Sequence, residues 1–166
     1  MILEVDAVDT FYGETQALFG ASLAIEHAKV FALLGPNGAG KTTFFNVLTG
    51  RVKPSRGRVL LGGEDVTGLS PHRIAAKGIA RSFQIMTLFD EPSQGLAPKI
   101  VGDVLATILR MKDEGIASLV VEQNAEIALS VADHAAVIDR GRIVWTGEAA
   151  ALRDDRGLRQ RLLGVQ

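Results

Sequence analysis

The chain contains no cysteine, and it has only one tryptophan and one tyrosine. Without cysteine, disulfides and thiolate metal sites are excluded. No apolar run approaches the roughly 20 residues that a membrane-spanning helix requires. Acidic residues stand near the N-terminus, where a secretory signal has a basic segment followed by an apolar one. These absences predict a cytoplasmic location, with any membrane role exerted through a partner.

The sequence also lacks an excess of charge of either sign. Its formal net charge is -1, so no overall basic field favours binding to nucleic acid or to an anionic membrane surface. Hydrophobic residues make up 47% and charged residues 22%, as is usual for a globular protein. We therefore expect one folded domain over residues 1–166, with a buried core and no nucleic-acid partner.

Short apolar segments alternate with helical patterns, which is typical of an α/β fold. Residues 2–5 alternate like a half-buried edge strand. Residues 30–34 form a continuous apolar run, as expected for a strand that is buried on both faces. Residues 58–61 predict another strand, which ends at the turn-forming pair Gly62–Gly63.

The second half of the sequence begins with a helical pattern. Pro98 suits a first helical turn and Gly115 a helix end. Residues 119–121 predict a short strand, and residues 135–146 predict a hairpin that turns at 139–142. A charged helical tail follows. The apolar positions with helical spacing are Ile100, Val104, Ile108 and Met111.

The strongest motif is residues 35–43, GPNGAGKTT, which match the pattern G-x-x-x-x-G-K-[ST]. The buried strand precedes this motif, and residues 44–48 predict a helix that can end at Gly50. The alternative, a strand-to-helix turn that binds nothing, is disfavoured because both the motif and its flanks are complete. The residues expected to hold a nucleotide are Gly35, Pro36, Asn37, Gly38, Ala39, Gly40, Lys41, Thr42 and Thr43.

The chemistry of this motif suits a triphosphate. Its glycines let successive backbone N–H groups converge on phosphate oxygens, and the helix start adds the positive end of a dipole. Lys41 can reach the β- and γ-phosphates, and the Thr42 hydroxyl can ligate Mg²⁺.

Further segments resemble the ABC transporter ATPase family, in order along nearly the whole chain. Residues 48–50 and 54–63 follow the phosphate-binding motif as in that family. Residues 78–84 resemble its Q-loop, residues 90–98 its Walker B and D-loop region, and residues 139–144 its C-terminal hairpin. The resemblance implies a P-loop NTPase core, with a mixed sheet flanked by helices and an N-terminal antiparallel β subdomain. It also implies an ATPase that uses ATP and Mg²⁺.

Within that family, several segments resemble the ATPase subunits of branched-chain amino acid importers. Residues 65–74 and 80–84 resemble one such subunit, and residues 92–98 and 121–125 resemble the other. The resemblance implies an ATP-hydrolysing subunit that powers import of branched-chain amino acids. Its partners would be transmembrane permease subunits and a second ATPase subunit, identical or different. The subunit would then lie on the inner face of the cell membrane.

The resemblance also assigns roles to individual residues. Tyr12 would stack on adenine, although a tyrosine that merely ends a strand is the alternative. Asp90 would hold Mg²⁺ through water, Glu91 would be the general base, and Gln84 would contact Mg²⁺ or the attacking water. Gln123 stands where the family has a histidine that contacts the γ-phosphate, and it can donate a hydrogen bond but carries no proton for transfer. The three histidines, His27, His72 and His134, are expected to be structural or solvated.

The sequence departs from the family between the Q-loop and Walker B. Only five residues, 85–89, separate Gln84 from Asp90, where the family has a helical subdomain with a Leu-Ser-Gly-Gly-Gln signature. Three explanations remain open: the segment is disordered and left out of the 166-residue sequence, it was removed by engineering, or the protein naturally lacks it. We favour an omitted segment between Phe89 and Asp90. The alternative function is a nucleotide-binding module without turnover.

Overall fold

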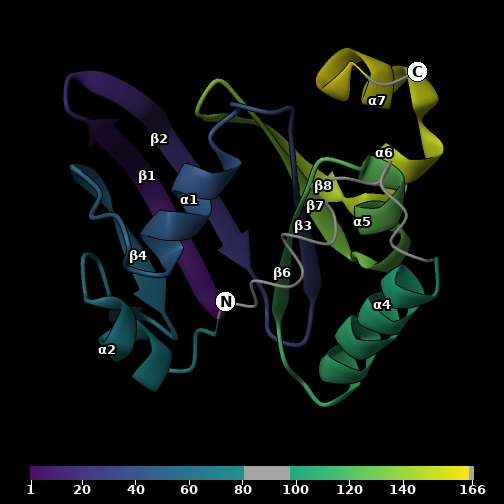
Figure 1. Cartoon of the computed structure of the whole chain (residues 1–166), viewed down its shortest axis with the longest axis horizontal. Coiled ribbons are helices and arrows are strands. Elements are labelled where there is room, and N and C mark those ends of the chain that lie inside the picture. Colours follow the sequence, from purple (N-terminus) through teal and green to yellow (C-terminus); the bar gives the residue numbers. More distant parts are fainter. Residues whose placement is uncertain (81–97, 165–166) are drawn as a thin grey trace. The chain divides into compact units, whose positions relative to one another are not determined.

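The computed structural model describes residues 1–80 and 98–164 (Figure 1). These residues fall into two compact units, and each is described by itself. The first unit comprises Met1–Glu26, Pro36–Arg81 and Ile138–Val144. The second comprises His27–Gly35, Ser82–Val137 and Trp145–Gln166. The predicted single domain over residues 1–166 stays a prediction.

The first unit contains an antiparallel sheet with the strand order β2-β1-β4-β5. The strands are β1 (Leu3–Tyr12), β2 (Thr15–Ile25), β4 (Arg56–Leu61) and β5 (Glu64–Asp65). Figure 1 shows β1 between β2 and β4. The expected N-terminal antiparallel β subdomain is therefore confirmed.

The prediction of an edge strand at residues 2–5 is wrong. β1 pairs along one side with β2 and along the other with β4. The alternating pattern arose because Leu3, Val5 and Val8 face the core while the residues between them are more exposed. Alternation reports that one face of a sheet is covered, and it carries no information on strand order.

Two helices complete the first unit. Helix α1 (Lys41–Leu48) begins at the phosphate-binding motif and buries Phe44, Val47 and Leu48. It starts three residues before the predicted segment and ends, as expected, before Gly50. Helix α2 (Pro71–Ala76) is a short helix with proline in its first turn, where the missing N–H costs no hydrogen bond.

The second unit is built on a sheet with the order β6-β3-β7-β8. Its strands are β3 (Val30–Leu34), β6 (Ser118–Glu122), β7 (His134–Asp139) and β8 (Arg142–Glu148). β3 runs parallel to both β6 and β7, and all five of its residues are buried. This is the burial that a continuous apolar strand in a parallel sheet predicts. The β7–β8 hairpin, whose tip belongs to the first unit, is also as predicted.

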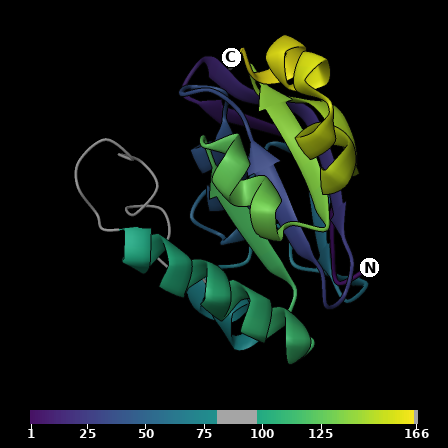
Figure 2. The same cartoon turned by 90° about the vertical axis from the view of Figure 1, so that its right-hand side faces the viewer.

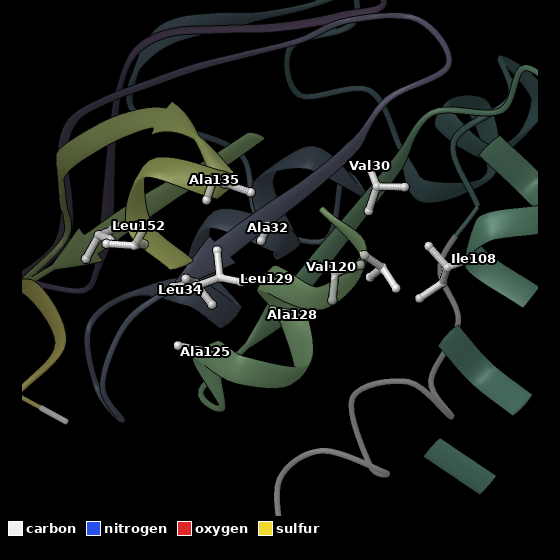
Figure 3. Packing of buried hydrophobic residues seen from close by; sticks show 13 residues of the cluster. Val30, Ala32, Leu34, Ile108, Val120, Ala125, Ala128, Leu129, Ala135 and Leu152 are labelled. Carbon is white, nitrogen blue, oxygen red and sulfur yellow. The ribbon is translucent and has the colours of Figure 1, made fainter. Parts of the chain in front are cut away.

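Helices cover one face of this second sheet (Figures 1 and 2). They are α4 (Pro98–Asp113), α5 (Ala125–Val131) and α6 (Ala149–Asp154), and α7 (Arg156–Leu163) follows α6. Alternate residues of β3 meet these helices in one apolar cluster, which Figure 3 shows from close by. The labelled members are Val30, Ala32, Leu34, Ile108, Val120, Ala125, Ala128, Leu129, Ala135 and Leu152.

Asp133 joins several elements of the second unit. Its Oδ2 accepts a hydrogen bond from the Val30 N–H at 2.9 Å, and its Oδ1 accepts one from Lys112 Nζ at 2.6 Å. Its backbone N–H donates to the Val30 carbonyl, and its carbonyl accepts from the Ala149 N–H. Burial by itself raises the pKa of Asp133. The hydrogen bonds from Lys112 and Val30 and the charges of Lys112 and Lys29 outweigh that effect, so the pKa is lowered.

We predict that Asp133→Asn lowers the free energy of unfolding at pH 7 by about 1 to 2 kcal/mol, because the charged hydrogen bond to Lys112 is lost. A lowered folded-state pKa means that the carboxylate stabilises the protein above the ordinary pKa of about 3.9. This contribution disappears as the pH falls through the folded-state pKa. Urea unfolding at pH 7 and at acidic pH measures the difference between variant and wild type, which should shrink in acid.

Asp103→Asn provides the control, since Asp103 is an exposed carboxylate on α4. It should change stability little at either pH. A deficit of Asp133→Asn that is equally large at both pH values would contradict the role given to the ionised carboxylate.

Candidate functional site

The phosphate-binding motif forms a tight loop that leads into α1. Gly40 is the N-cap of α1 and has a left-handed backbone, with φ of 105°. A Cβ at this position would lie 3.2 Å from Leu18 Cδ2 and 3.3 Å from both the Ala17 carbonyl oxygen and Gly141 Cα. Both the conformation and the close packing therefore require glycine at the helix start.

The loop is closed by contacts to the Pro36 carbonyl oxygen. The Ala39 N–H donates to this oxygen at 3.2 Å, and Lys41 Nζ donates to it at 2.9 Å. Pro36 and Gly38 are exposed, and a Cβ at Gly38 would have no atom within 4 Å. The Lys41 ammonium is thus bonded back to the beginning of the loop, and the loop is exposed to solvent at Pro36 and Gly38.

The chemistry of this helix start fits a polyanion. α1 has no acidic residue in its first turn, and its N-cap has no side-chain oxygen to accept from the first N–H groups. The dipole places partial positive charge at that end, and the Lys41 ammonium adds a full charge nearby. Thr42 is exposed and supplies a hydroxyl oxygen, the kind of ligand that Mg²⁺ accepts. The residues therefore fit a nucleoside triphosphate with its magnesium ion.

The other predicted site residues are distributed over the chain. Tyr12 is the last residue of β1, and it is 50% exposed. Gln123 is exposed between β6 and α5, and it belongs to the second unit. Gln84, Asp90 and Glu91 lie outside the described residues. The structure thus brings the loop residues 36–43 together in the first unit.

The expectation that the three histidines are structural or solvated stays a prediction. His134 packs its ring against Phe31, with 6.2 Å between ring centroids, while His27 and His72 are exposed. Over residues 1–80 and 98–164, no group of three or more His, Cys, Asp or Glu side chains is arranged to hold a metal ion. In the same part of the chain, no helix has the length and apolar character that crossing a membrane requires.

Sequence reasoning missed Gly141, which contacts the phosphate-binding loop from the β7–β8 turn. Its N–H donates to the Ala39 carbonyl oxygen at 2.7 Å. The glycine of the turn was visible in the sequence, but a turn signal does not indicate which distant backbone the turn touches.

A comparison with protein families shows to which family this chain belongs. The model described as ABC transporter matches residues 18–136. The chain belongs to the ABC transporter family. This confirms the resemblance drawn from the motif at 35–43 and the segments that follow it, and with it the ABC-type ATPase class.

Two curated relatives of this ABC protein come from Pseudomonas aeruginosa. The high-affinity branched-chain amino acid transport ATP-binding protein BraF is 26% identical over 249 positions, which cover 98% of this chain and 98% of BraF. The corresponding protein BraG is 28% identical over 232 positions, which cover 98% of this chain and all of BraG. The expected likeness to ATPase subunits of this kind is confirmed.

Solved structures of ABC cassettes share the fold. A nucleotide-free ATP-binding cassette from an ABC transporter matches with a TM-score of 0.80 at 21% identity, over 99% of this chain and 95% of that one. An ABC cassette in its ADP conformation matches with a TM-score of 0.74 at 23% identity, over 99% of both chains. The α/β fold predicted from the sequence, with a mixed sheet and an antiparallel β subdomain, is confirmed.

Proposed function

We propose that this ABC protein is the ATP-binding and ATP-hydrolysing subunit of an importer for branched-chain amino acids. The loop at residues 36–43, which leads into the uncapped start of α1, carries the proposal. The printed names of BraF and BraG, which refer to branched-chain amino acid transport, support the choice of solute. The choice of solute rests on these relatives and on the sequence resemblance alone, because no role toward the solute is assigned to any residue above.

The nucleotide would be held chiefly by backbone amides of the loop. Lys41 would exchange its contact with the Pro36 carbonyl for the β- and γ-phosphates, and its ammonium would then face anionic oxygens instead of a neutral carbonyl. The Thr42 hydroxyl would ligate Mg²⁺, which when bound neutralises charge on the β- and γ-phosphates. Tyr12 would place its exposed ring against adenine, where stacking tolerates any base.

Hydrolysis would require residues from beyond this loop. Glu91 would take a proton from the attacking water as general base. Asp90 would hold Mg²⁺ through water, and Gln84 would contact Mg²⁺ or the attacking water. Gln123 would meet the γ-phosphate as a neutral hydrogen-bond donor, because an amide carries no titrating proton.

The proposed partners are transmembrane permease subunits and a second ATPase subunit, identical or different. ATP would then be enclosed between the two ATPase subunits. Binding energy from contacts away from the reacting phosphate would close the site and exclude water. The subunit would act in the cytoplasm, on the inner face of the membrane, through its contact with the permease.

The proposal includes a further segment between Phe89 and Asp90 in the natural protein, which the 166-residue sequence omits. The alignment with BraF extends over 249 positions, whereas this chain has 166 residues. BraF therefore carries many residues with no counterpart here, and their place between Phe89 and Asp90 is inferred from the family resemblance. A chain that truly lacks the signature segment could bind ATP but could not complete its partner's site. A nucleotide-binding module without turnover is then the second candidate.

The intact mass of the natural protein distinguishes these candidates. An omitted segment predicts a mass well above the 17.7 kDa of the 166 residues. Mass spectrometry of protein purified from its source measures this directly. A mass equal to that of the 166 residues would reject the omitted segment and favour the module without turnover.

We predict that Lys41→Ala lowers the affinity for Mg-ATP or its turnover by at least about tenfold, because a direct phosphate charge is removed. Calorimetric titration and an ATPase assay provide the readouts. Lys53→Ala is the control, because it removes the same charge from an exposed position in the same unit. Wild-type binding together with wild-type turnover in Lys41→Ala would count against the loop as the triphosphate site.

We predict that Glu91→Gln retains Mg-ATP binding but abolishes hydrolysis in the complete protein, because the amide cannot accept the proton of the attacking water. The loss should be seen in phosphate release at saturating ATP. Glu26→Gln changes an exposed glutamate in the first unit and should leave turnover unaffected. Normal turnover by Glu91→Gln would show that another group is the base.

A further inference from the structure

We infer that Gly141, at the tip of the β7–β8 hairpin, is a positioning residue for the phosphate-binding loop. The inference rests on the proposed function, because it assigns Gly141 to the site that would hold ATP. No contact with the nucleotide is assigned to Gly141 itself. It acts through Ala39 and Gly40, the two residues that precede α1.

Gly141 links the loop to strand β2 through its own backbone. Its N–H donates to the Ala39 carbonyl oxygen at 2.7 Å, and its carbonyl oxygen accepts from the Phe19 N–H at 2.9 Å. Ala39 is only 3% exposed, so its hydrogen bond is shielded from competing water. One residue of the turn therefore ties the buried part of the loop to a strand of the antiparallel sheet.

This link sets the direction of an amide that phosphate would need. In a trans peptide, the C=O and the following N–H point in opposite directions. The Ala39 carbonyl points at the Gly141 N–H, so the Gly40 N–H points away from the hairpin. Gly40 is one of the loop residues expected to bind phosphate. The hairpin thus fixes the orientation of that peptide plane before nucleotide arrives.

Only glycine fits at position 141. Its φ of +75° is a conformation that side chains disfavour, and a Cβ there would lie 2.2 Å from the Ala17 carbonyl oxygen and 2.9 Å from Phe19 Cδ2. The Ala17 oxygen is backbone and cannot rotate away. The loop and the turn are also close at Gly40, where a Cβ would lie 3.3 Å from Gly141 Cα. A side chain at position 141 would therefore push the hairpin away from the loop.

Arg142, the residue after Gly141, also links the turn to strand β2. The Arg142 guanidinium lies over the Phe19 ring, 4.9 Å from its centroid. A cation above an aromatic face is attracted by the ring quadrupole. Phe19 therefore makes two contacts with the turn. Its N–H donates to the Gly141 carbonyl oxygen, and its ring lies under the Arg142 guanidinium.

The test compares Gly141→Ala with Gly62→Ala. Gly62 also lies in a hairpin turn of the first unit with a positive φ of +57°, but a Cβ there would have no atom within 4 Å. Both variants should melt earlier because alanine is strained at positive φ. Only Gly141→Ala should weaken Mg-ATP binding, by about tenfold, because displaced site geometry costs affinity out of proportion to stability. Calorimetric titration and thermal melting give the two readouts.

The outcomes separate this inference from the proposed function. Failure of the folded wild-type chain to bind Mg-ATP would reject the proposed function, and the inference with it. Wild-type binding together with equally tight binding by Gly141→Ala would overturn the positioning role alone.

A second measurement does not depend on the variant folding. In the wild-type chain, the Gly141 amide should exchange its hydrogen slowly, because it is bonded to the buried Ala39 carbonyl. Exchange at the rate of an unprotected amide would also overturn the inference.

Discussion

The start of α1 is the feature on which the function of this protein depends. The start of α1 has no side-chain cap, and it carries the partial positive charge of the helix dipole. Gly40 permits this start, because its left-handed backbone turns the loop into the helix without a side chain in the way. The Lys41 ammonium adds a full positive charge beside it. Phosphate oxygens are the natural acceptors for such an arrangement.

The rest of the first unit keeps that helix start in place. Strand β2 contributes Leu18 against Gly40, and the β7–β8 hairpin contributes a hydrogen bond to Ala39. The contacts are made by backbone and by buried side chains, which have little freedom to relax. Because the electrostatic strength of a site depends on fixed geometry, the hairpin belongs to the binding apparatus although it carries no reactive group.

The second unit packs helices against one face of a parallel strand, β3. The alternate residues Val30, Ala32 and Leu34 pack against α4, α5 and α6, and Asp133 satisfies the first N–H of β3. The Lys112 ammonium allows the Asp133 carboxylate to remain charged in this half-buried position. A firmly held β3 matters for function because the phosphate-binding loop follows it directly in the chain.

Local patterns predicted most of this structure from the sequence. The apolar run 30–34, the helical stripe from Pro98 and the hairpin turn each have a signal within a few residues, and all three are present. Strand β2 was missed because it alternates clearly only near its end, at Ala21, Leu23 and Ile25.

Helices α2 and α5 were missed because they span only six and seven residues, too few for a helical period to stand out. The order of β1 in its sheet and the contact of Gly141 with Ala39 depend on tertiary packing, for which neither segment carries a local signal. In the candidate site, the loop could be predicted because its chemistry is contiguous in sequence. The roles of Gln84, Asp90, Glu91 and Gln123 came only from resemblance to the family.

The most direct measurement of the central claim is an amide NMR titration of the wild-type chain with Mg-ATP and, separately, with adenosine. With Mg-ATP, the backbone amides of residues 38–43 should show large, saturable shifts, and with adenosine the shifts of these amides should be much smaller. Saturable binding of Mg-ATP that leaves these amides unshifted would contradict the central claim, because the triphosphate would then be held elsewhere.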